Sequence, residues 1–453
     1  MRFGRKVLYT SVEKVNRDNI VAVLNKALPD YQMNKADINY LWEYYKGNQP
    51  ILYRTKDVRP EICNRIIENR ANEIVAFKTG YLLGEPIQYV SRKDDAVQAV
   101  NLFNDMVFAD DKTAKDKEIA DWFHICGTAY RIIVPDDSDV FRTHVLSPLN
   151  SFVIYTSELG NAPVLGVSVQ QDDDMVMHYH CYTTDMYYHI VGGMDIVEER
   201  AHYLGDVPII EYPLNMARLG AFEIVLTLLD AINMTDSNRL DGVEQFVQAL
   251  MLFHNVDIKP DDFRALRDEG ALKFRDVDPQ MKADVSYLIS NLSQNETQTL
   301  DDHFYQAVLT ICGMPNRNGG SSTSDTGSAV IMRDGWSAAE TRAKNAEQMF
   351  RLSEKKFLRI ALRLCRLTTA LDIDVNDIEI RFTRRNYENI YQKAQVLDLM
   401  LNNDKIAPIL AFEQSGMFTD PNLAYSESEE YASRIEQRSN DDATRNVGGR
   451  QTS

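Results

Sequence analysis

Apolar side chains in the first 125 residues recur mostly at the spacing of an α-helix. In the segment 37–45 they fall at i, i+3, i+4 and i+7, and the residues concerned are Ile38, Leu41, Trp42 and Tyr45. A second apolar series begins after Pro60 and ends at Gly80, two residue types common at the start and the end of a helix. We therefore predict a mostly helical region, with a turn and a short strand at 81–92 and further helix, interrupted by a charged run, at 94–123.

The pattern changes between residues 127 and 213. Short runs rich in Val, Ile, Tyr and Thr, such as TAYRIIV and SFVIYT, alternate with turn clusters such as PDDSD and ELGNAP. Several short strands at regular spacing are typical of an antiparallel β-rich domain, which we predict for this region.

Helical spacing returns in the centre of the chain. One long pattern without proline covers 221–253, and the turn-rich segment 256–290 follows it. Ser293 and Glu296 then stand at the spacing of a capping box, ahead of a second apolar stripe that ends near residue 312. The order predicted here is helix, small insert, helix.

The last third of the chain begins with a loop rich in Gly and Ser at 314–329. A long helix is predicted at 338–371, because large apolar residues recur every seven positions on one face: Phe350, Phe357 and Leu364. The alternating segment 377–385 predicts a strand. Helices are expected at 386–437, and the polar residues 438–453 predict a disordered tail.

The amino-acid composition argues against several classes of function. The chain has 453 residues with 49 Lys+Arg against 67 Asp+Glu, a formal net charge of −18. This balance argues against a general nucleic-acid binder, whose surface is normally basic. Five scattered cysteines without a CxxC pair suit a reducing compartment. The sequence contains no run of 18 apolar residues, so we predict no membrane-spanning helix.

Two enzyme-like motifs are weak. The string Asp325-Thr326-Gly327-Ser328 matches the D-T-G-S of aspartic peptidases, and a homodimer could supply the second carboxylate that this chemistry needs. The residues before it are GGSSTS instead of the apolar strand that would hold the site rigid, so a flexible loop is the favoured interpretation. The same loop lacks the lysine of a Walker A motif, which argues against ATP hydrolysis by this chain.

The chain has one cluster of His and Cys residues: His178, His180, Cys181 and His189. Two histidines at alternate strand positions would share a face, which is acceptable for metal ligands. No second motif of defined spacing completes a site, so surface or interstrand histidines are the favoured interpretation and we expect no bound metal.

The two central helices are acidic. The first carries five acidic residues and a single basic residue, Arg239; the acids are Glu223, Asp230, Asp236, Asp241 and Glu244. The second carries three acidic residues and no basic one; the acids are Glu296, Asp301 and Asp302. Two solvated helix faces would account for this. The alternative is a negatively charged lining, which would repel a polyanion and suit its passage better than its capture. The long third helix has a basic excess, and its Glu and aromatic repeats favour a packed interface over a nucleic-acid groove.

The order of segments resembles the portal proteins of tailed double-stranded DNA phages, in particular the branch common in siphophages of Gram-positive hosts. The stretches that carry the resemblance are YYKGNQPILYR (44–54), RPEICNRIIENRANEIVAFKTGYLLGEPIQYV (59–90), DGVEQFVQALMLFHNV (241–256), HFYQAVLTICGMPN (303–316), TGSAVIM (326–332) and DIEIRFTRRN (377–386). The resemblance covers about residues 35–435.

The resemblance implies an α+β, mainly helical subunit of a ring, typically of twelve copies, at one capsid vertex. Its parts would be a wing (1–225, β-rich at 127–213), two stem helices (226–253 and 294–312), a clip (254–293), a tunnel loop (314–329), a long wing helix and strand (330–385), a crown (386–437) and a disordered tail (438–453).

DNA would pass through such a ring during packaging and ejection. The residues that the resemblance places at the DNA are Asn316, Arg317, Asn318, Gly319, Gly320, Ser321, Ser322 and Thr323. The acidic candidates for the channel lining are Asp236, Asp241, Glu244, Glu296, Asp301 and Asp302. The implied partners are the terminase large subunit, scaffold and major capsid proteins and a head–tail adaptor. We expect no enzymatic activity, no cofactor and no membrane contact, with assembly in the host cytoplasm.

Overall fold

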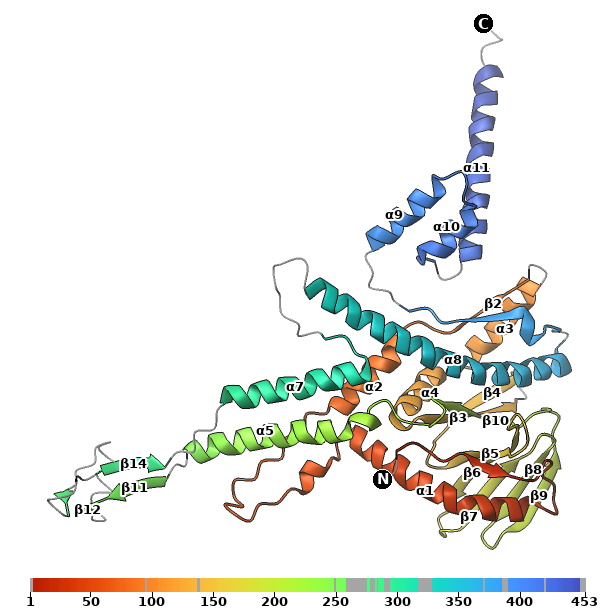
Figure 1. The fold of residues 1–453 in the computed structure, drawn as a ribbon. Coiled ribbons are helices and arrows are strands. Elements are labelled where there is room, and N and C mark those ends of the chain that lie inside the picture. Colours follow the sequence, from red (N-terminus) through yellow and green to blue (C-terminus); the bar gives the residue numbers. More distant parts are fainter. Residues whose placement is uncertain are drawn as a thin grey trace.

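A computed structural model gives the fold of the chain (Figure 1). The structure describes residues 3–93, 96–136, 139–247, 250–257, 275–277, 282, 284–288, 294–316, 328–369, 371–384, 390–418 and 421–448. A mixed α+β body holds the two largest sheets. Two long helices project from it to one side, and a small helical unit with the C-terminus rises from it on another.

The N-terminal helices are α1 (Ile20–Lys46), α2 (Arg70–Leu82), α3 (Val97–Ala109) and α4 (Lys112–Cys126). The predicted helical face at 37–45 lies in α1, which ends at Gly47 in a left-handed conformation with φ 103°. The prediction of a helix starting after Pro60 is wrong in its first part, because residues 63–69 form no regular secondary structure and α2 begins only at Arg70. The charged run expected to interrupt the next helices lies mostly within α4.

The predicted β-rich region contains eight strands: β3 (Thr128–Pro135), β4 (Phe141–Leu146), β5 (Ser151–Thr156), β6 (Pro163–Gln171), β7 (Met177–Tyr182), β8 (Met186–Val191), β9 (Asp195–Ala201) and β10 (Ile209–Pro213). They form two sheets, one in the order β1-β5-β6-β7-β8-β9 and one in the order β10-β3-β4. All pairings are antiparallel except that of β1 (Leu8–Thr10), which runs parallel to β5. Helix α1 covers one face of the larger sheet, where Leu24 and Tyr31 pack with Phe152 and Leu165.

The largest core lies under α8 (Ser328–Thr368), which begins ten residues before its predicted start. Phe350, Phe357 and Leu364 are all buried there, which confirms the seven-residue apolar repeat. The strands β2 (Gln88–Ser91) and β15 (Ile378–Arg381) were each predicted, and they pair antiparallel beside this helix. The chain therefore brings together two strands almost 300 positions apart.

The projecting part consists of α5 (Leu226–Val247) and α7 (Gln294–Cys312). The prediction that the first of these helices reaches residue 253 is wrong at its end. Leu250–His254 is instead strand β11, which pairs with β14 (Asp284–Leu288). The short strands β12 (Val256–Asp257) and β13 (Arg275–Asp276) also pair. Most of the insert between β12 and β14 lies outside the described residues.

The C-terminal unit contains α9 (Ile390–Leu401), α10 (Pro408–Ser415) and α11 (Pro421–Gly448). The expectation of disorder from residue 438 is wrong for its first part, because α11 continues to Gly448. Among the described residues, no helix is both long and apolar enough to cross a membrane.

Candidate functional site

The acidic helices α5 and α7 lie side by side and run in opposite directions (Figure 1). They pack through apolar residues near the body, where Leu229 and Ile232 of α5 join Val308 and Leu309 of α7 in one buried cluster. Helical spacing places these side chains on one face of each helix. The pair is therefore anchored at its base and projects from the body.

The end of α7 is defined by a glycine. Gly313 has φ 63°, its N–H donates to the carbonyl of Thr310 (3.1 Å), and the N–H of Met314 donates to that of Leu309 (2.8 Å). This is a Schellman motif, and the buried Met314 completes it with an apolar contact. The Nζ of Lys78 donates to the carbonyl of Cys312 at 2.7 Å, and burial lowers the pKa of this lysine to about 8.

The first residue of the predicted DNA-facing loop is held at this helix end. The Nδ2 of Asn316 donates to Oε1 of Gln306 on α7 at 2.8 Å. Asp325 of the peptidase-like motif lies outside the described residues. So do the other seven predicted loop residues, namely Arg317, Asn318, Gly319, Gly320, Ser321, Ser322 and Thr323. The structure thus gives the point where the loop leaves α7, fixed by a glycine and a lysine.

A row of buried polar side chains on α5 binds the segment 64–68. Asn233, Ser237 and Asp241 stand at i, i+4 and i+8 and are all buried. The backbone N–H groups of Glu68, Ile66 and Asn64 donate to these three side chains at 2.8, 3.0 and 2.7 Å respectively. The row replaces the hydrogen bonds that a helix at 62–69 would have made, which explains why this segment is not helical.

Asp241 is therefore a structural residue in this subunit. It is 2% exposed, its Oδ2 lies 3.1 Å from the guanidinium of Arg54, and it is also paired with Lys56. Burial opposes its ionisation, but hydrogen bonds from Lys56 and Asn64 outweigh this and hold the pKa of its carboxyl below the usual value. The expectation that Asp241 lines a channel is contradicted by this burial, and the physical reason is that two cations and an amide already occupy its oxygens.

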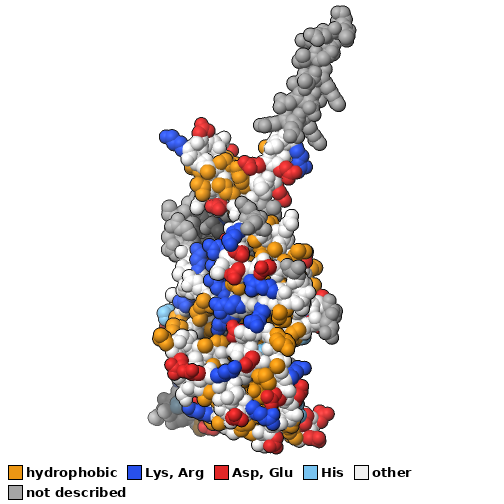
Figure 2. Space-filling model, turned by 90° about the vertical axis from the view of Figure 1, so that its right-hand side faces the viewer, with side chains coloured by type: hydrophobic (Ala, Val, Ile, Leu, Met, Phe, Trp, Pro, Cys, Tyr) orange, Lys and Arg blue, Asp and Glu red, His pale blue; other side chains and the backbone are white. Residues whose placement is uncertain are grey.

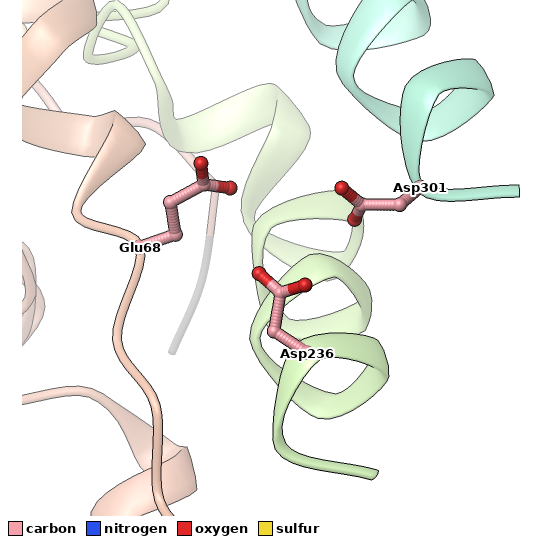
Figure 3. A group of neighbouring side chains, drawn as sticks. All are labelled: Glu68, Asp236 and Asp301. Carbon is pink, nitrogen blue, oxygen red and sulfur yellow. The ribbon is translucent and has the colours of Figure 1, made fainter. Parts of the chain in front are cut away.

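Two other predicted acids meet across the helix pair. Asp236 of α5, Asp301 of α7 and Glu68 form a cluster in which one carboxylate oxygen of each lies within 4.8 Å of the others (Figure 3). Burial first, and then the charges of Asp236 and Glu68, raise the pKa of Asp301 to about 6. Carboxylate oxygens are ligands that Ca²⁺ and Mg²⁺ prefer, so these are the residues that could hold such an ion. Our expectation of the lining included Asp236 and Asp301 but missed Glu68.

Basic groups flank this cluster and limit its charge. Arg239 lies 3.6 Å from Asp236 on the same helix. Arg70 is paired with Glu68 and stacks over the ring of Tyr305 on α7, with 3.8 Å between the guanidinium carbon and the ring centre. The cluster therefore joins three elements, namely α5, α7 and the segment before α2.

The remaining predicted acids lie apart from this cluster. Glu296 and Asp302 are exposed on α7, and Asp302 accepts a hydrogen bond from Gln298 at 2.9 Å. Glu244 of α5 is half-buried. An exposed acidic surface thus exists on α7, while the acids of α5 divide between the surface and the interior.

The His/Cys cluster is split by the pleat of strand β7. Cys181 is buried in the core under α1, whereas the rings of His178, His180 and His189 stack on the other face of the sheet. Nδ1 of His178 lies 2.9 Å from Nε2 of His189, and its Nε2 lies 2.9 Å from Asp172. Successive positions of a strand face opposite sides, so Cys181 cannot share a site with the three histidines.

The glutamates that recur every seven residues on α8, namely Glu340, Glu347 and Glu354, form ion pairs. Glu340 lies 2.8 Å from Arg384, and Glu347 pairs with both Arg351 and Arg384. Glu354 is fully buried, 3.0 Å from Lys112 and 3.3 Å from Arg131. The hydroxyls of Tyr89 and Tyr212 also donate to it, at 2.5 and 2.7 Å. These contacts fix α8 to helix α4, to the sheet β10-β3-β4 and to the strand pair β2-β15.

The sequence profile of the family described as phage portal protein, SPP1 Gp6-like, matches residues 24–441. The chain belongs to this family. It is a portal protein, a component of the phage capsid that forms a ring at a capsid vertex. The match confirms the resemblance found in the sequence, and it supports a structural role. Nothing in it supports the peptidase alternative.

Chains of solved structures also match this portal protein. Among solved structures, 113 chains match. One belongs to the neck of an empty GTA particle computed with C6 symmetry, with a TM-score of 0.45 and 11% sequence identity, and the match covers 77% of this chain and 90% of that chain. No curated protein matches the chain.

Proposed function

We propose that α5 and α7 line the channel of the ring through which double-stranded DNA passes during packaging and ejection. The observation that carries this proposal is the helix pair itself, which projects from the body as one unit and exposes acidic residues such as Glu296 and Asp302. Long helices arranged around an axis make a rigid barrel, and head-to-tail contacts between identical subunits close into a ring. We expect twelve subunits.

An acidic lining suits passage rather than capture. A protein that neutralises phosphates binds DNA tightly and in a salt-dependent way, which would oppose sliding. Exposed carboxylates repel phosphates over about a Debye length of 8–10 Å and keep the polymer from adhering to the wall. We further propose that the body is the wing, that the insert 254–293 is the clip, that residues 314–329 are the tunnel loop, and that α9 to α11 form the crown.

The tunnel loop is proposed to contact the DNA. It leaves α7 at the fixed Gly313 and returns to the body through α8. We propose that Asn316 marks its start and that Arg317 to Thr323 approach the DNA. The proposed partners are the terminase large subunit, which supplies the ATPase, the scaffold and major capsid proteins, and a head–tail adaptor. The protein itself is proposed to have no enzymatic activity and to assemble in the host cytoplasm.

Light scattering of the purified full-length chain, combined with negative-stain imaging, tests the proposal. We expect a closed ring with an axial hole, and a compact monomer or dimer would contradict it. A second test replaces Glu296 and Asp302 by Lys, with Glu13 and Glu158 on the body as matched charge controls. We expect the stem variant to assemble and to package less DNA than the control. Equal packaging by both variants would contradict an acidic channel lining.

A further inference from the structure

A band of Lys and Arg side chains crosses the face of the subunit opposite the free ends of α5 and α7. Figure 2 shows this band at the height of α8 and β15 in Figure 1. Four basic residues on α8 recur at intervals of four: Arg351, Lys355, Arg359 and Arg363. At 1.5 Å per residue they form a row about 18 Å long. The apolar face of the same helix is buried in the core, so the row is the solvent side of a rigid element.

A groove of about 670 Å³ lies beside this row, between α8, β15 and the short helix Val375–Asp377. Arg92, Lys355 and Arg359 line it and are exposed. No acidic side chain within the described part of the chain pairs with any of these three cations. The groove therefore presents three positive charges on a chain whose net charge is −18.

The two acidic residues in the groove wall already have partners. Glu379 lies 3.2 Å from Arg381, and Asp374 accepts the N–H of Asn376 at 3.0 Å to cap the short helix. With Arg351, the lining holds four basic and two acidic side chains, so a positive excess of two charges remains. The local excess of positive charge is thus a property of the folded subunit.

The apolar residues in the groove wall offer little surface to a partner. Leu358, Ile378 and Ile380 are 0%, 6% and 4% exposed, and Val375 is half-buried. A protein partner normally binds through apolar or aromatic anchors at the centre of the interface, with charges at its rim. A phosphate backbone needs only cations and polar donors. The chemistry of the groove therefore favours phosphates over an acidic protein segment.

We propose that this groove binds the phosphate backbone of double-stranded DNA on the outside of the ring. The inference rests on the proposed function, in which α5 and α7 line the channel and this face points away from it. The same subunit would then repel DNA inside the channel and retain DNA around its outer surface. Because only three cations are involved per subunit, the contact is weak and salt-sensitive, and many subunits of a ring act together.

Binding of covalently closed circular DNA to assembled rings of the full-length chain tests the inference. Circular DNA cannot thread through a closed ring, so its binding reports on the outer surface. We expect rings to bind it, and the variant Arg92→Gln/Lys355→Gln/Arg359→Gln to bind about tenfold more weakly or worse. The logarithm of the association constant falls with the logarithm of the salt concentration. The magnitude of this slope should be smaller for the variant by about 0.9 for each phosphate that it no longer neutralises, or roughly 2.7 for the three cations of one subunit's groove.

The matched control removes three exposed lysines in and before α1, as Lys14→Gln/Lys26→Gln/Lys46→Gln. An equal reduction of binding in both variants would show that DNA senses only net charge, and would overturn the inference. Preferential binding of polyglutamate over DNA by unmodified rings would identify an acidic protein partner and would also overturn it. The charge-preserving variant Arg92→Lys/Arg359→Lys should retain binding, and Lys355→Gln alone tests the groove if the triple variant does not assemble.

Failure of this inference can be distinguished from failure of the proposed function. If the unmodified chain forms no ring, the proposed function fails. If rings form and package DNA but the groove variant binds circular DNA as well as unmodified rings, only the outer DNA contact is refuted.

Discussion

Replacing Asp241 tests whether an acidic residue of α5 is structural or belongs to the channel surface. Its side chain is 4% exposed, its carboxylate contacts Arg54 and Lys56, and it accepts two hydrogen bonds from Asn64, from the backbone N–H at 2.7 Å and from Nδ2 at 2.9 Å. The side chain of Arg54 is itself only 9% exposed. Removing the carboxylate therefore takes a counter-charge from the nearly buried Arg54, which keeps hydrogen bonds to Asn64 and Asn238, and leaves the part-buried N–H of Asn64 without its acceptor.

We expect Asp241→Ala to destabilise the attachment of segment 54–68 to α5 by about 3–5 kcal/mol, the usual effect of removing one partner of a buried ion pair. At 1.4 kcal/mol per factor of ten, this corresponds to roughly a hundredfold or greater increase in local opening. Hydrogen exchange measured on peptides covering 54–68 reports this opening directly. Asp241→Asn should destabilise the segment less, because the amide oxygen can still accept from Asn64.

Glu244→Gln on the same helix is the matched control, since Glu244 is half-buried and should leave exchange in 54–68 unchanged. The pKa of Asp241 is held below its usual value of 3.8, so its contribution should be present above that pH and be lost as the pH falls further. If Asp241→Ala leaves exchange in 54–68 at the level of the control, the carboxylate does not anchor the segment and our account of α5 is wrong.

Three further predictions concern other residues. The pKa of Asp301 is raised to about 6, so the folded chain binds this proton more tightly than the unfolded chain does, and stability should decrease as the pH rises from about 4 to 6. In thermal unfolding, Asp301→Asn should remove this dependence of stability on pH. After allowance for solvent screening, it should stabilise the chain at pH 7 by about 1 kcal/mol. Glu354→Gln leaves Lys112 and Arg131 short of one buried negative charge and should cost about 3–5 kcal/mol in denaturant unfolding, with the exposed Glu379→Gln as control. Gly313→Ala should cost about 1 kcal/mol or more in thermal stability, because φ is 63° and a Cβ would meet the side chain of Arg342; an unchanged melting temperature would contradict the role of the Schellman motif.

Local patterns in the sequence determined most of the elements. The seven-residue repeat of Phe350, Phe357 and Leu364 predicted a helix with one buried face, and α8 has that face because its period matches the turn of an α-helix. The capping-box spacing and the Gly313-Met314-Pro315 run likewise bracket α7. Such signals depend on residues within a few turns of one another, so they can be read without knowing the fold.

Tertiary structure alone decided which acidic side chains face outward. Asp236 and Asp241 are five positions apart on the same helix and look equivalent in the sequence. One meets Glu68 and Asp301, while the other is buried against Arg54 and Lys56. The segment 62–69 has helical apolar spacing, yet it is not helical because side chains more than 160 positions later accept its backbone N–H groups. Counting charged residues gives the sign of a helix's net charge. Burial and ion pairing with distant residues determine which of its charges remain available to DNA.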